Sequence, residues 1–177
     1  SIGFRAPSVR AMMSEFAEHL ANKTDTSLRY TDKNLTSQTH HAEISSSAIE
    51  SIKEILQDKL KTDDEIRRWF GEYLSENRTE YQFDIPSSLI SNYEELKILL
   101  KENTQLHHSP ASTFLFSGEN STVVLFVDGK SFMVSGAFAK ILCAHYTIPT
   151  SEINNLSLSD EEKTTLIYLY NHASLYF

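Results

Sequence analysis

A two-residue turn constrains the fold of this chain more than any other local feature. Asp128 and Gly129 separate two runs of apolar and β-branched residues, 123–127 and 131–134. An Asp-Gly pair readily takes the left-handed backbone conformations of a type I′ turn, which matches the twist of paired strands. The sequence therefore predicts an antiparallel β-hairpin at this point.

Further elements are predicted on both sides of the hairpin. Strands are expected at 113–116 and, as a short closing strand, at 174–177. Apolar residues at three- and four-residue spacing, together with capping signals, predict helices. The expected helices open at Pro7-Ser8, Ser47, Thr62, Ser91, Gly136 and Ser159. Ser47 with Glu50, Thr62 with Glu65 and Ser159 with Glu162 form the Ser/Thr-x-x-Glu pattern of a capping box.

The chain changes character near residue 85. Residues 1–84 are helical in pattern, with a polar connector from Asn22 to Ser45, and residues 85–177 mix helices and strands. The predicted fold class is α+β, with an N-terminal helical region followed by a small α/β module.

Charge and cysteine content exclude several classes of protein. The net charge of −8 disfavours nucleic acid and anionic membranes as partners. No apolar run approaches the roughly 20 residues of a membrane span. Cys143 is the only cysteine, which favours a reducing, cytoplasmic setting and a buried apolar role for its side chain. Residues 85–177 contain no arginine, the usual reader of guanine edges.

Two groups of histidines suggest metal binding and are weighed against simpler interpretations. His41-x-Glu43 resembles part of the ligand set of non-haem iron oxygenases, but it lies in the polar connector, where a solvated loop is the better account. His40-His41 and His107-His108 match no known metal-ligand spacing. Ser109-Pro110 predicts that the second pair lies in a loop.

Apolar side chains on the helical region are candidates for an interface. Arg67-Arg68 beside Trp69 allows a nucleic-acid contact, but helical spacing favours Trp69 as a core or interface anchor with solvated arginines beside it. A helical hairpin with this pattern exposes more apolar surface than one small layer can hide. The interface candidates are Trp69, Phe70, Tyr73, Ile52 and Leu56.

Two motifs, in order and at similar spacing, resemble bacterial ribosomal oxygenases of the cupin (JmjC) type. Residues 1–7 (SIGFRAP) are similar to the segment that leaves the barrel of those enzymes, and residues 69–75 (WFGEYLS) to a segment of their helical dimerisation region. Tyr30-Thr31-Asp32 and His41-Ala42-Glu43-Ile44 fall where the family has similar stretches. The likeness covers residues 1–78. Beyond residue 85 it extends only to element order and size, with Tyr170-Asn171-His172 and Tyr176-Phe177 as loose remnants of a closing aromatic motif.

The resemblance implies a role for each part of the chain. Residues 1–7 would be the exit strand of a cupin barrel, 8–84 a helical dimerisation region that pairs two subunits, and 85–177 a winged-helix-like domain. The family uses Fe(II) and 2-oxoglutarate to hydroxylate an arginine of a large-subunit ribosomal protein. Its metal triad lies in the barrel, so no catalytic, iron-binding or 2-oxoglutarate-binding residue is expected in this chain, and this portion alone would be non-catalytic.

Two alternatives stay open at this point. The chain could be an autonomous protein-interaction scaffold with no enzymatic parent. It could also be a nucleic-acid-binding winged-helix protein, which the acidic charge makes the less favoured of the two.

Overall fold

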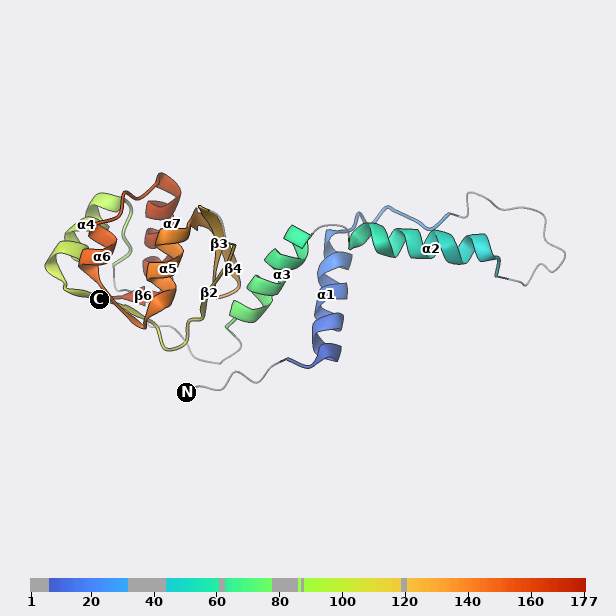
Figure 1. Ribbon diagram of the computed structural model, residues 1–177, viewed down its shortest axis with the longest axis horizontal. Helices are drawn as coiled ribbons and strands as arrows, with labels where there is room; N and C mark the ends of the chain where they lie inside the picture. The colour runs from blue at the N-terminus through green and yellow to red at the C-terminus, as the bar shows by residue number, and fades with distance from the viewer. Residues whose placement is uncertain (1–6, 32–43, 61–62, 78–85, 87, 119–120) are drawn as a thin grey trace. The chain divides into compact units, whose positions relative to one another are not determined.

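The contacts of the chain divide it into two compact units that meet within one helix. One unit spans Ser1–Trp69, here called the helical unit, and the other spans Phe70–Phe177, here called the α/β unit. The computed structural model describes residues 7–31, 44–60, 63–77, 86, 88–118 and 121–177 (Figure 1). The two units are described separately.

The helical unit contains α1 (Val9–Lys23), α2 (Ser46–Lys59) and the first half of α3 (Asp63–Ser75). Ser8 is the N-cap of α1, as predicted, and its Oγ accepts a hydrogen bond from the Ala11 N–H at 3.1 Å. Helices α1 and α3 contact through Phe16 and Trp69, whose ring centroids lie 4.6 Å apart. The same two helices are also joined by Lys23 Nζ, which donates to Glu65 Oε1 at 3.1 Å.

Two of the predicted helix starts are displaced. The cap of α2 is Ser45 rather than Ser47, because Ser45 has extended backbone and accepts the Ala48 N–H at 3.1 Å. Ser47 lies inside the helix, and Glu50 pairs with Lys53 instead of closing a capping box. Three consecutive serines can each cap a helix, which is why the sequence pattern placed this start two residues late. Thr62 lies outside the described residues.

Helix α4 (Tyr93–Glu102) has Asn92 as its N-cap, one residue after the predicted start. The Asn92 side chain accepts the Glu95 N–H at 3.1 Å. The Glu95 carboxylate in turn accepts the Ser91 N–H at 2.8 Å. The start of α4 is therefore held by the side chains of Asn92 and Glu95, not by the side chain of Ser91.

The predicted hairpin is confirmed. Strands β2 (Phe114–Ser117), β3 (Thr122–Val127) and β4 (Lys130–Ser135) form an antiparallel sheet in the order β2-β3-β4. Both turn residues have positive φ, 48° at Asp128 and 79° at Gly129, as a type I′ turn requires. The Asp128 carboxylate also accepts hydrogen bonds from the Ser112 and Ser174 hydroxyls, each at 2.8 Å. The turn is thereby fixed to two other segments of the α/β unit.

A second sheet joins strands that lie far apart in the sequence. Its strands are β1 (Gln105–His108), β5 (Thr147–Pro149) and β6 (Leu175–Tyr176), antiparallel in the order β5-β1-β6. The closing strand β6 was predicted, but β1, β5 and the short helix α6 (Thr150–Asn154) were not. The placement of His107-His108 in a loop was wrong, because both residues belong to β1.

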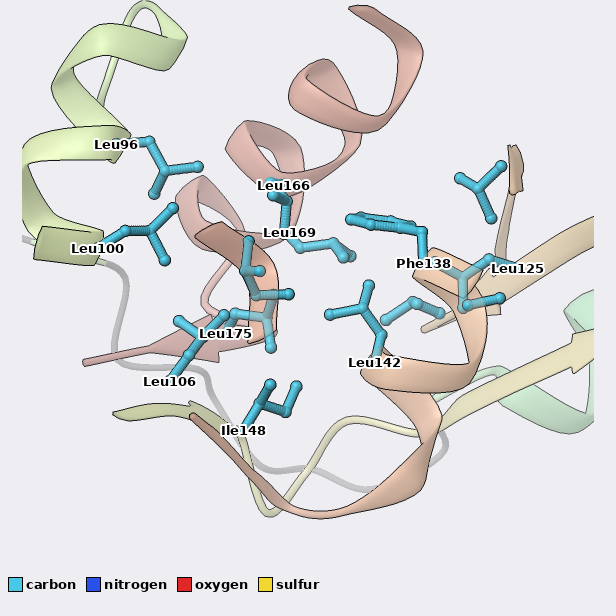
Figure 2. Close-up of a cluster of buried hydrophobic side chains, with 14 of the residues drawn as sticks. Leu96, Leu100, Leu106, Leu125, Phe138, Leu142, Ile148, Leu166, Leu169 and Leu175 are labelled. Atoms are coloured by element: carbon cyan, nitrogen blue, oxygen red, sulfur yellow. The ribbon is translucent and has the colours of Figure 1, made fainter. Parts of the chain in front are cut away.

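Helices α4, α5 (Gly136–Ala144), α6 and α7 (Asp160–Asn171) gather on one side of the β2-β3-β4 sheet (Figure 1). Alternate residues of β3 point into the core between these elements. The labelled core side chains come from helices and from both sheets (Figure 2): Leu96, Leu100, Leu106, Leu125, Phe138, Leu142, Ile148, Leu166, Leu169 and Leu175.

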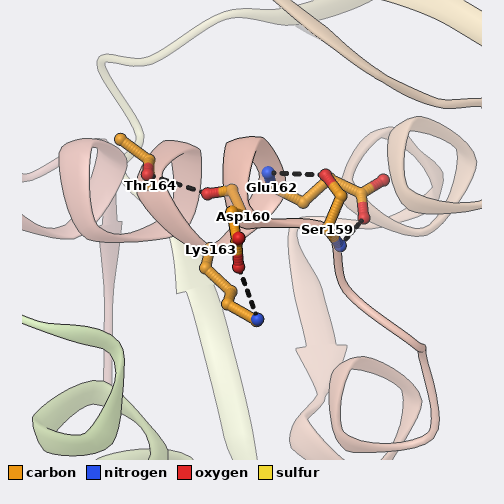
Figure 3. Close-up of polar contacts among 5 residues, drawn as sticks. All are labelled: Ser159, Asp160, Glu162, Lys163 and Thr164. Atoms are coloured by element: carbon orange, nitrogen blue, oxygen red, sulfur yellow. Dashed lines mark hydrogen bonds and ion pairs between the residues drawn. The ribbon is translucent and has the colours of Figure 1, made fainter.

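The predicted capping box of α7 is confirmed. The Ser159 Oγ accepts the Glu162 N–H at 3.2 Å, and Glu162 Oε2 accepts the Ser159 N–H at 2.8 Å (Figure 3). The other carboxylate oxygen of Glu162 accepts the Ser135 N–H at 2.9 Å, at the N-cap of α5. Burial raises the pKa of Glu162, but the hydrogen bonds from Ser135 and Ser159 outweigh this and lower it on balance. One buried carboxylate thus joins the starts of two helices.

Candidate interaction surface on the helical unit

Helix α2 carries a continuous row of exposed apolar side chains. They recur at three- and four-residue spacing, which places them on one side of the helix. Each is between 43% and 61% exposed. This row, called the α2 face, consists of Ile49, Ile52, Ile55, Leu56 and Leu60.

The opposite side of α2 is polar. Lys53 Nζ lies 3.0 Å from Glu50 Oε2 on the exposed surface, and Glu54 and Gln57 are also exposed. A helix with this division normally packs its apolar side against another element. No residue of α1 or α2 is buried, and among the described residues the buried hydrophobic side chains begin at Tyr73. Among the described residues, the α2 face therefore leaves about half of each apolar side chain exposed.

The structure exposes the predicted interface residues to different extents. Ile52 and Leu56 lie together on the α2 face. Trp69 is half-buried on α3, against Phe16 of α1. Phe70 is 41% exposed, whereas Tyr73 is only 7% exposed and belongs to the buried residues of the α/β unit. Tyr73 consequently offers little surface to a partner, while Ile52 and Leu56 offer much of theirs.

A close packing contact explains the glycine in the segment 69–75. A Cβ at Gly71 would overlap the ring of Phe126, on the face of β3 opposite the leucine core. Beyond this contact, the Ser131 hydroxyl donates to Glu72 Oε1 at 2.7 Å and the Gly129 N–H donates to Ser75 Oγ at 3.2 Å. The last turns of α3 are therefore fixed to the hairpin. Sequence reasoning missed this role, because the contact joins segments far apart in the chain.

The second histidine pair is used for packing. Successive residues of β1 point to opposite faces, so His107 and His108 do not share a site. His107 Nδ1 lies 3.1 Å from Thr147 Oγ1. His108 is 7% exposed and stacks on Phe114 with ring centroids 3.9 Å apart. Burial lowers the pKa of His108 to about 4, so the ring is neutral near pH 7.

No metal centre is assembled by the part of the chain that the structure describes. There, no group of three or more His, Cys, Asp or Glu side chains is placed to hold a metal ion. The first candidate set, His40, His41 and Glu43, lies outside the described residues. The described side chains thus do not fit an iron site, and no iron chemistry is assigned to them.

The start of α7 carries exposed acidic side chains, which bears on a nucleic-acid role. The first turn of α7 contains Asp160, Glu161 and Glu162. The first two are exposed and would repel phosphate groups.

None of the helices in the described residues is long and apolar enough to cross a membrane.

Comparison with known proteins identifies relatives of this fold. A family model described as ROXA-like winged helix matches residues 54–176. The ribosomal protein uL16 3-hydroxylase of Escherichia coli (strain K12) is 27% identical over 86 residues, which cover 49% of this chain and 23% of that protein.

Solved structures agree in fold over nearly the whole chain. An X-ray structure of E. coli YcfD superposes with a TM-score of 0.81 at 19% identity, covering 99% of this chain and 46% of that one. A structure of YcfD as a ribosomal oxygenase gives a TM-score of 0.80 at 20% identity, covering 99% and 48%. A third, of YcfD in complex with cobalt and 2-oxoglutarate, gives 0.78 at 19% identity, covering 99% and 47%. The chain spans less than half of the length of these relatives.

Proposed function

Because the chain belongs to the ROXA-like winged-helix family, we propose that it supplies the dimerisation and winged-helix portion of a cupin-type hydroxylase acting on a ribosomal protein. Its α+β fold with a winged-helix domain and its relation to the ribosomal oxygenase YcfD are the premises. In this proposal the helical region pairs two subunits, and the winged-helix domain follows it in the chain. A cytoplasmic location follows from a ribosomal protein substrate.

The half-exposed α2 face is the observation that carries the dimerisation proposal. Its five apolar side chains are 43–61% exposed, and no residue of α1 or α2 is buried. Contiguous exposed apolar patches of a few hundred Å² often serve as interaction surfaces. In a symmetric dimer, the same patch on each copy covers the other.

The mass of the chain in solution tests this proposal. Light scattering at high micromolar concentration is expected to give twice the mass of the 20.2 kDa chain. Ile52→Asp, which places a charge in the α2 face, is expected to give a monomer. The matched control Gln57→Asp adds the same charge on the polar side of the helix and should remain dimeric. A wild-type chain of single mass would contradict the proposal.

The catalytic chemistry is placed outside this portion. The E. coli relative binds 2-oxoglutarate and cobalt in one of its structures, and we assign the equivalent iron and 2-oxoglutarate to a cupin barrel of the same protein. Residues 1–6, most of the segment predicted to be the exit strand of that barrel, lie outside the described residues. The chain alone is then expected to release no succinate from 2-oxoglutarate in the presence of Fe(II). Measured turnover would overturn this assignment.

The reading frame upstream of Ser1 distinguishes this proposal from an autonomous interaction scaffold. A barrel sequence with His-x-Asp and a later His would support a hydroxylase. An initiator Met directly before Ser1 would support the scaffold.

A further inference from the structure

Helix α2 is too short to be stable through its own backbone hydrogen bonds. It has 14 residues, and isolated helices of about 12–15 residues are marginal in water because the first turn is costly to form. Its local supports include the Ser45 cap and the exposed ion pair between Glu50 and Lys53, and exposed pairs contribute little. Most helices in proteins are stable because they bury an apolar side, and α2 buries no residue within one chain.

A second copy of the chain is a suitable cover for the α2 face. Five aliphatic side chains, each about half exposed, present on the order of 450 Å² per copy, roughly half of the ~800 Å² that each partner contributes to a stable interface. Helix α2 carries both signs of charge, with Lys53 and Lys59 against Glu50, Glu54 and Asp58. Two copies can therefore approach without a large like-charge penalty.

The α/β unit does not depend on a partner in this way. Leu125, Phe138 and Leu142 are completely buried among residues of the same unit. Helix α5 is shorter than α2, with nine residues, yet its Phe138 and Leu142 anchor it in this core. The contrast between α5 and α2 lies in burial, not in length or capping.

We propose that α2 becomes stably helical only when two copies of the chain associate through the α2 face, whereas the α/β unit is folded in both states. The inference rests on the proposed dimerisation and adds its mechanism: the interface is formed by a segment that folds as it binds. The fraction of chains with a folded α2 should then increase with the concentration of the chain.

Hydrogen exchange of the full chain at different concentrations tests the coupling. Peptides covering residues 46–59 and 121–144 are followed by mass spectrometry from high micromolar to nanomolar concentration, with the mass measured in parallel by sedimentation. On dilution into the monomer, protection of 46–59 is expected to fall by about tenfold or more, while 121–144 stays protected.

Two variants provide the comparison at constant concentration. Ile52→Asp is expected to be monomeric, with 46–59 unprotected and 121–144 protected. Gln57→Asp is expected to match the wild type in mass and in exchange.

Each outcome decides between the two proposals. Protection of 46–59 in a monomeric species, whether diluted wild type or Ile52→Asp, overturns the coupling but leaves dimerisation intact. A wild-type chain that is monomeric at every concentration overturns dimerisation, and the coupling with it. A dimeric Ile52→Asp chain shows that pairing uses another surface and also overturns the coupling.

Discussion

The helical unit and the α/β unit differ in where their apolar side chains lie. In the α/β unit the large aliphatic and aromatic residues of two sheets and four helices enclose one another. In the helical unit the equivalent residues form exposed rows, and no side chain of α1 or α2 is buried. Both units have well-formed caps and helical periodicity. The comparison therefore teaches that local pattern specifies the elements, whereas burial determines which region is stable alone.

The largest effect is expected from emptying the core of the α/β unit. Phe138→Ala removes a completely buried ring and should lower the free energy of unfolding by about 3–5 kcal/mol. Denaturant titration of the α/β unit measures the loss. Met133→Ala, at an exposed position of β4 in the same unit, should change it by less than about 0.5 kcal/mol. Equal losses in the two variants would contradict the description of this core.

Acid should destabilise the α/β unit through His108. Burial lowers the folded-state pKa of His108 to about 4 from its ordinary 6.5, so protons bind more tightly to the unfolded chain. The contribution of His108 to the free energy of unfolding is then fully present above pH 6.5. It falls by roughly 2–3 kcal/mol as the pH drops toward 4. Unfolding titrations across this range measure the slope.

His108→Phe provides the control for this pH dependence. Without a titrating ring, the loss between pH 6.5 and 4 should largely disappear. Glu162, whose pKa is lowered, contributes stability that is lost only at lower pH, as the pH falls through its folded-state pKa. A slope that survives in His108→Phe would assign the effect to other groups.

A smaller loss is expected where α3 meets the hairpin. Gly71→Ala would force a methyl group into the ring of Phe126, which costs about 1–3 kcal/mol in a packed site. Alanine recovers about 1 kcal/mol of helix propensity, so a net loss of up to about 2 kcal/mol is expected in denaturant titration. In the double variant Gly71→Ala, Phe126→Leu, the smaller leucine side chain should relieve the overlap. The steric cost and the gain in helix propensity should then come closer to cancelling. A more stable Gly71→Ala chain would show that α3 moves away freely.

The smallest effect on the α/β unit is expected from the α2 face. Ile52→Ala should change the unfolding of the α/β unit by less than about 0.5 kcal/mol. The same variant should weaken the proposed dimer by about tenfold, since it removes roughly 1.4 kcal/mol of apolar contact. Sedimentation measures the second effect. If Ile52→Ala changed the free energy of unfolding of the α/β unit as much as the free energy of dimerisation, the two units would not be independent in stability.

Local chemistry was sufficient to predict much of this fold. Asp128 and Gly129 determine their turn through their own backbone preferences, and Ser159 with Glu162 closes its capping box within four residues. The closing strand at residues 175–176 was also predicted. These features depend on neighbours in the sequence, so the sequence pattern is enough to find them.

The missed features depend on distant partners. Gln105–His108 form a strand because they pair with 147–149 and with 175–176, and nothing within four residues indicates this. Gly71 is required because of Phe126. The exposure of Ile52 and Leu56 follows the predicted pattern, whereas burial of Tyr73 required the sheet against which α3 packs. Their roles in an interface remain predictions.

Strand β1 has a consequence for the order in which the protein is made. It is the central strand of its sheet, yet both neighbours, β5 and β6, follow it in the sequence. During synthesis, one edge of β1 stays unpaired until residues 147–149 leave the ribosome, and the other edge stays unpaired until residues 175–176 do. Because such long-range pairing forms late and slowly, the nascent chain carries Leu106 and His108 without their final cover. In a ribosome-bound chain that stops before Leu175, β1 is expected to lack its hydrogen-bonded partner β6.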